Sequence, residues 1–190
     1  YTLSLHDALP IFGEVASKTI VSSMTAGWET IDVSTYLKTQ KAKGATSVTL
    51  VIASFKNTKP DANGNLVING YTLSFDSEEA TNKPYLLING GGTPLTPTDD
   101  STIAGATPTT NLGGALTLGT SWSWGDPLAE RHIYLKFDLS GVGSINTAVL
   151  NLYRIAAATS AASGVTYPVT VFACSNYTTV GGSTQWSEST

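Results

Sequence analysis

The chain has 190 residues, of which 41% are hydrophobic and 13% charged, and its formal net charge is -4 at pH 7. This length suits one large β-sandwich or two small domains. With only 10 Lys and Arg residues and neither a basic stripe nor a basic helix, the sequence argues against a nucleic-acid or anionic-membrane partner. It also contains no apolar run long enough for a membrane-spanning segment.

The N-terminal sequence YTLSLHDALPIF, residues 1–12, is set apart from the fold. It has no initiator Met and no basic start of a signal peptide, and it resembles the translated read-through of a sequencing adapter. We therefore expect residues 1–12 to be a non-native leader in which His6 and Asp7 carry no chemistry. The C-terminal sequence QWSEST stops without a closing strand, so we expect a fragment of a longer gene product.

Strands alternate with polar turns through the first half of the chain. Alternating or continuous apolar and β-branched residues predict strands at residues 14–23, 28–33, 46–55, 71–75 and 84–88. Ser34 is placed to cap a short helical turn, which Gly44 closes. Residues 57–71 contain Pro60 and two Asn-Gly pairs, which predict a long polar loop.

After Ile88 the sequence NGGG leads into a stretch of Thr and Pro, which predicts a junction between two parts of the chain. Beyond it we expect two short strands within residues 100–119, a loop with two tryptophans, and longer strands at residues 131–140, 147–156 and 165–175. Helical patterning is nearly absent. This spacing of short strands predicts an all-β fold, an antiparallel jelly-roll β-sandwich.

Several segments of the second part follow one another in a recognisable order: Asp100, TTNLGG at 109–114, Arg131, LKFDLS at 135–140, AVLNLY at 148–153, and Trp186 with Glu188. In the first part, GWETIDVSTYL at 27–37 and SFDSEEATNKPYLLI at 74–88 complement them. Together these segments resemble the domain of carbohydrate-binding module family 96, also called the DNRLRE domain. Residues 92–190 resemble its N-terminal half and residues 13–91 its C-terminal half.

This resemblance implies that the C-terminal half of one module is followed by the N-terminal half of the next. Because the two parts are complementary, we expect them to close as a circularly permuted single sandwich. In that arrangement residues 46–55 and 131–140 would share one core. The alternative is two open half-domains with exposed strand edges, which would aggregate.

The resemblance also implies a non-catalytic polysaccharide-binding module of a secreted bacterial protein, located outside the cell or on its surface beside neighbouring modules of the same parent chain. Members are associated with alginate-like polymers, whose carboxylates call for Lys and Arg. Rings that can stack on sugars and nearby bases make up the candidate ligand-binding set: Trp122, Trp124, Arg131, Lys136, Lys83 and Tyr85. Trp28 is a further candidate ring. The alternative function is a structural or adhesive spacer repeat of a large surface protein.

We expect no catalytic residues, because no acid/base constellation is visible. Asp32 and Asp138 interrupt apolar strands, and we expect each to accept backbone N–H groups at a strand end. His132 is the only histidine outside the leader, so a Ser-His-Asp triad has no motif behind it.

Cys174 is the only cysteine, and its place in an alternating apolar stretch predicts a small buried core residue. No cofactor is expected. A structural Ca²⁺ remains an alternative, because the acidic clusters at residues 76–79 and at Asp99 and Asp100 could supply oxygen ligands. Their spacing matches no fixed calcium loop, so solvated turns are the expected role.

Overall fold

Apolar and β-branched runs form strands along most of the chain that the structure describes. The computed structural model describes residues 11–21, 25–54, 59–60, 66–67, 72–107, 109–110, 112–121, 127–155 and 166–174. In the first half the elements are β1 (Ile11–Val21), β2 (Gly27–Asp32), α2 (Ser34–Ala42), β3 (Ser47–Ser54), β4 (Lys59–Pro60), β5 (Leu66–Val67), β6 (Thr72–Asp76) and β7 (Tyr85–Ile88). They continue with β8 (Asp99–Ala104), β9 (Thr117–Ser121), the 3₁₀ turn η1 (Pro127–Ala129), β10 (Arg131–Asp138), β11 (Ala148–Arg154) and β12 (Thr166–Cys174).

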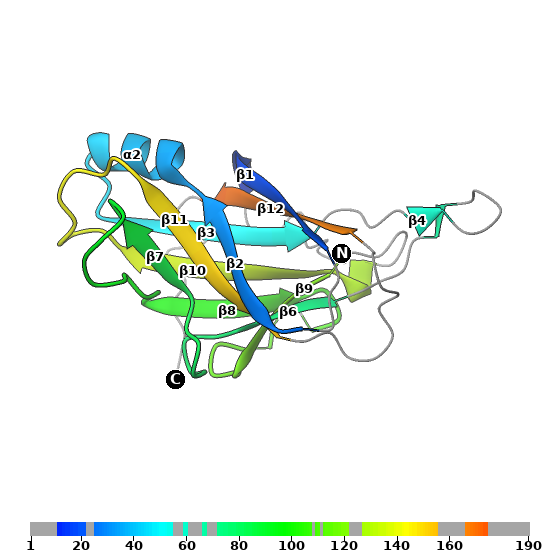
Figure 1. Cartoon of the computed structure of the whole chain (residues 1–190). Coiled ribbons are helices and arrows are strands. Elements are labelled where there is room, and N and C mark those ends of the chain that lie inside the picture. The colour runs from blue at the N-terminus through cyan, green and yellow to red at the C-terminus, as the bar shows by residue number, and fades with distance from the viewer. Residues whose placement is uncertain are drawn as a thin grey trace.

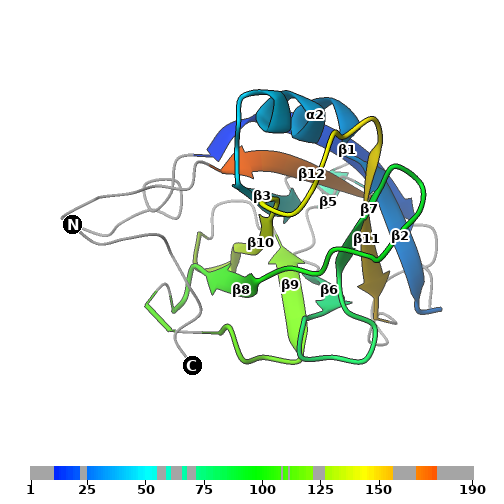
Figure 2. The same ribbon diagram turned by 90° about the vertical axis from the view of Figure 1, so that its left-hand side faces the viewer.

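One antiparallel sheet of 10 strands dominates the described part of the chain, in the order β1-β12-β3-β10-β9-β6-β11-β2, with β7 also paired to β11 and β8 to β10. The sheet curls on itself until its edge strands β1 and β2 lie close together. The result is a nearly closed, sandwich-like barrel with α2 on the outside (Figures 1 and 2). The predicted all-β antiparallel fold is confirmed.

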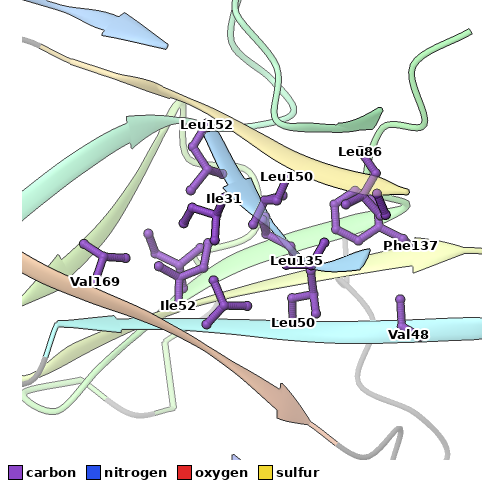
Figure 3. Packing of buried hydrophobic residues seen from close by; sticks show 14 of the residues in the cluster. Ile31, Val48, Leu50, Ile52, Leu86, Leu135, Phe137, Leu150, Leu152 and Val169 are labelled. Atoms are coloured by element: carbon purple, nitrogen blue, oxygen red, sulfur yellow. The ribbon is translucent and has the colours of Figure 1, made fainter. Parts of the chain in front are cut away.

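Strands from both parts of the chain share one core. β3 pairs with β10, with Leu50 directly opposite Leu135. Both side chains belong to the same buried cluster as Ile31 of β2 and Leu150 of β11. Figure 3 shows the side chains of β3 pointing into this cluster towards those of β2 and β11. The expected shared core is confirmed, whereas the assignment of the two parts to separate copies of a module stays a prediction.

The junction after β7 is a fixed turn. Asn89 adopts a left-handed backbone with φ of 54°, which Asn tolerates better than most residues. Its Oδ1 accepts hydrogen bonds from the backbone N–H groups of Asn146 (2.7 Å) and Thr147 (3.2 Å), and its Nδ2 donates to the carbonyl of Ser144 (2.8 Å). Asn89 thereby ties the junction to the turn before β11.

Two local predictions need correction. The helix at residue 34 has Val33 as its N-cap and no side-chain cap, so Ser34 does not cap it. Instead the Ser34 hydroxyl accepts a hydrogen bond from the Ala148 N–H (2.8 Å), while Asp32 accepts the Ser34 N–H. The predicted loop at residues 57–71 contains the paired strands β4 and β5. The other predicted strands are present, with β1 beginning at Ile11 rather than residue 14.

An ion-paired cluster bridges the two edge strands of the barrel. Glu29 of β2 contacts Lys18 of β1 through a 2.8 Å ion pair and Arg154 of β11 through a 3.1 Å ion pair. β1 and β2 are not hydrogen-bonded neighbours in the sheet order. The two edge strands are therefore linked by side-chain ion pairs rather than by backbone hydrogen bonds, and we call this place the seam of the barrel.

Candidate functional site

Eight outward positions on β2, β11 and β7 form a grid on the outside of the barrel, which we call the open face. Strand pairing places Trp28 of β2 opposite Tyr153 of β11. Asn151 of β11 lies between Thr30 of β2 and Tyr85 of β7. Val149 of β11 lies between Asp32 of β2 and Leu87 of β7. The residues between them, such as Ile31 and Leu150, point into the core. Because side chains alternate along a strand, the same three strands seal the core and present this grid to solvent.

An aromatic cluster occupies one end of the open face. The Trp28 ring lies 5.2 Å from Tyr85 and 5.3 Å from Tyr153 between ring centroids, at interplanar angles of 68° and 73°. Edge-to-face contacts of this kind each contribute about 1 kcal/mol and fix the orientation of the rings. Trp28 nevertheless remains 44% exposed, and the two tyrosines are half-buried. The cluster is a rigid aromatic surface open to solvent.

Polar groups beside the rings are short and mostly neutral. Asn151, at the centre of the grid, is only 6% exposed, and its Nδ2 donates to the carbonyl of Val149 at 3.0 Å. Thr30 and Asp32 are exposed on β2. A face with stacked rings flanked by a few short polar groups can hold a flat, partly apolar molecule by contact and hydrogen bonding.

The candidate residues named from sequence do not all lie together. Tyr85 lies in the open face. Lys83 lies two residues before it and is exposed; its charge acts on Glu78. Trp122 and Trp124 lie outside the residues that the structure describes.

Arg131 and Lys136 lie on β10, which β9 and β6 separate from β11 in the sheet order. Arg131 is exposed at the start of the strand. Lys136 forms a 3.0 Å ion pair with Asp99 of β8. Figure 2 shows β10 and β8 on the side of the barrel away from β2 and β7. These two bases are therefore not neighbours of Tyr85.

Tyr153 is a residue of the open face that is not among the candidates named from sequence. The alternation of AVLNLY does signal that Val149, Asn151 and Tyr153 share one side of β11. Sequence alone does not show that this side is open, nor that Trp28, from the other part of the chain, lies opposite Tyr153.

The sequence model of carbohydrate-binding module family 96 matches residues 92–190, just over half of the chain. The chain belongs to this family. No curated protein and no solved structure matches the chain. The resemblance inferred from sequence is confirmed for the second part of the chain.

Carbohydrate-binding module family 96 comprises non-catalytic binding modules, and such modules are typically extracellular. The matched residues include β11 with Tyr153, whereas Trp28 and Tyr85 lie before them. The open face is therefore assembled from the matched part and the part that precedes it. Among the helices of the described residues, none has the length and apolar character needed to cross a bilayer.

The two acidic clusters meet in space at one corner of the module. Asp100 accepts a hydrogen bond from the Glu78 N–H at 2.7 Å, and Asp76 accepts one from Asn82 at 2.9 Å. Burial raises the pKa of Glu78, while the charge of Lys83 acts in the opposite direction. Within the described residues no three His, Cys, Asp or Glu side chains group as a metal site requires. The structural Ca²⁺ stays an untested alternative at this corner.

Asp32 and Asp138 have the structural role expected from sequence. Each accepts the backbone N–H two residues later at 2.8 Å, from Ser34 and Ser140 respectively. Hydrogen bonds from the Ser34 hydroxyl and N–H hold the pKa of Asp32 below its ordinary value, and those from the Ser140 N–H and hydroxyl do the same for Asp138. Both carboxyl groups are thus stabilised as strand-end turn acceptors.

Cys174 is buried at the end of β12, as expected, and burial raises its thiol pKa to about 11. A thiol with so high a pKa is almost entirely protonated at neutral pH, which makes it a poor nucleophile.

Proposed function

We propose that this module binds a polysaccharide without turning it over and holds a secreted or surface-bound parent protein at its polymer. Two findings support the proposal: membership of a carbohydrate-binding family and the aromatic cluster of the open face, in which Trp28 is 44% exposed. The observation that carries it is the Trp28, Tyr85 and Tyr153 cluster, because an exposed ring held in orientation by two half-buried neighbours suits the C–H faces of sugars.

Such a module contributes by tethering. Holding the parent protein on its polymer turns each later encounter of a linked catalytic domain into an intramolecular one, which raises its effective concentration. Neighbouring modules of the same parent chain would add to this effect by multivalency. A shallow face is sufficient for this role, because long polymers present many equivalent segments.

The ligand is either an alginate-like polymer, as the family resemblance implies, or another glycan. Trp122, Trp124, Arg131, Lys136 and Lys83 stay candidates for ligand contact, in addition to the open face. If the tryptophans of residues 122–124 form a second contact, Trp122→Ala and Trp124→Ala should each weaken binding and leave the unfolding transition unchanged.

Affinity electrophoresis of the chain in native gels containing alginate, pectin or neutral glucans tests the proposal. We expect at least one polymer to retard the chain relative to a non-binding protein of similar charge. No retardation by any polymer would contradict the proposal and favour a structural or adhesive spacer. Release of reducing ends or unsaturated uronates from a bound polymer would instead show an enzyme.

A further inference from the structure

We propose that the open face takes a neutral glycan, one whose sugars carry no carboxylate or sulfate groups. The proposal rests on the proposed function, polysaccharide binding, and adds the site and the chemical class of the ligand. It is carried by the charges at and around the eight grid positions and by the exposed aromatic cluster.

The open face carries a single charged side chain, and that charge is negative. Three of its eight positions are aromatic, two are aliphatic, two are neutral and polar, and the last is Asp32. The hydrogen bonds from Ser34 that lower the pKa of Asp32 keep it ionised at neutral pH. A carboxylate on the face repels an anionic polymer and leaves a neutral one unaffected.

Three of the described bases are paired with carboxylates that lie off the open face. Lys18 and Arg154 pair with Glu29, whose side chain points to the opposite side of β2 from Trp28. Lys136 pairs with Asp99 on the far side of the barrel. Polyuronates carry a carboxylate on every sugar and are recognised through Lys and Arg, best in bidentate pairs.

The bases nearest in sequence also lie off the grid. Lys41 donates to the carbonyl of Leu139 at 2.8 Å, and Lys38 lies beside it on α2. That helix follows the Asp32 end of β2, whereas Trp28 lies near the other end, about 13 Å away along the strand. Lys83 precedes β7, and its charge acts on Glu78 at the acidic corner.

The aromatic cluster supplies the kind of contact that a neutral sugar can use. Ring stacking on C–H groups needs no charge, so it persists at high ionic strength, whereas pairing between exposed charges is screened. Because Trp28 is already held by Tyr85 and Tyr153, little side-chain freedom is lost when a ligand binds it.

The test is affinity electrophoresis of the whole chain and its variants at low and high salt. The probes are barley β-glucan, galactomannan and xyloglucan as neutral polymers, and alginate and polygalacturonate as anionic ones. Trp28→Ala and Tyr153→Ala remove rings of the open face. Trp28→Phe keeps a ring there, and Leu128→Ala removes an exposed apolar side chain from η1 as a matched control. Thermal unfolding of each variant confirms that it folds.

We expect retardation by at least one neutral polymer, equal at low and high salt. Trp28→Ala should weaken that binding by about tenfold or more, which corresponds to roughly 1.4 kcal/mol. Tyr153→Ala and Trp28→Phe should each weaken it less than Trp28→Ala does, because a ring remains at position 28, whereas Leu128→Ala should stay close to the wild-type chain.

Two results would overturn the neutral-glycan proposal and leave polysaccharide binding intact. One is retardation by alginate or polygalacturonate alone, lost at high salt. The other is neutral-polymer binding that persists unchanged in folded Trp28→Ala and Tyr153→Ala. Absence of retardation by every polymer would overturn the proposed function itself, and this proposal with it.

Discussion

Two walls of the same barrel differ in how many of their faces are buried. In β3, every residue from Val48 to Ser54 is buried, and Val51 on its outer side packs with Tyr134 and Cys174. In β2, across the core, Trp28, Thr30 and Asp32 on the outer side are exposed. The wall around β3 and β10, which we call the sealed wall, contributes stability from both faces. The wall of β2, β11 and β7 contributes it from one face and leaves the other available for binding.

The first prediction probes the core that both walls share. Phe137→Ala removes a fully buried ring of β10 and should lower the free energy of unfolding by about 4 kcal/mol, because it leaves a cavity in a packed interior. Urea denaturation followed by circular dichroism measures the loss. A loss below about 1 kcal/mol would mean that the two parts of the chain do not depend on one core.

A matched pair of outer-side valines tests the difference between the walls. Val51→Ala on the sealed wall should cost about 2 kcal/mol, since it empties buried space. Val149→Ala on the open face should cost less, about 1 kcal/mol or below, because Val149 is only half-buried. Equal losses in urea denaturation would erase the distinction between the two walls.

The seam where β1 meets β2 gives a smaller effect. Glu29→Gln removes the carboxylate that contacts both Lys18 and Arg154, and should cost about 1.5 kcal/mol, because the Arg154 side chain is only 9% exposed. As a control, Lys18→Ala removes only the more exposed partner, 31% exposed, and should cost below about 0.5 kcal/mol. Equal costs for the two variants would assign no special role to the Arg154 pair.

The smallest expected effect is shared by both walls, because each has a strand that ends in the same Asp turn. The folded-state pKa values of Asp32 and Asp138 lie below the ordinary value of 3.8. The unfolded chain therefore binds more protons near that pH, so their contribution is present above it and is lost as pH falls through the folded pKa. Asp32→Asn and Asp138→Asn should each make the free energy of unfolding fall less steeply as the pH is lowered into the acidic range. The same fall in both variants as in the wild-type chain would contradict this.

The difference between the walls could be read in part from sequence. SVTLVIAS is a continuous apolar run, which is typical of a strand buried on both faces, whereas GWETID alternates as a one-sided strand does. The shared core of β3 and β10 followed from their apolar runs and from the complementarity of the two parts.

The pairing of distant side chains could not be read locally. That Trp28 faces Tyr153 depends on the register between β2 and β11, which lie far apart in the chain. NGGG predicts a junction, but no local pattern shows that Asn89 is held there by backbone groups of residues 144–147. Nor does any local pattern show that β9 and β6 lie between β10, which carries Arg131 and Lys136, and β11, which pairs with the strand of Tyr85.

An NMR titration of the isotopically labelled chain with β-glucan oligosaccharides compares the two walls most directly. The account predicts that the amide resonances of Trp28, Tyr85 and Tyr153 move as the oligosaccharide is added, while those of Val51 and Tyr134 stay in place. Movement centred on Val51 and Tyr134, with Trp28 and Tyr153 unchanged, would contradict the assignment of the open face as the binding surface.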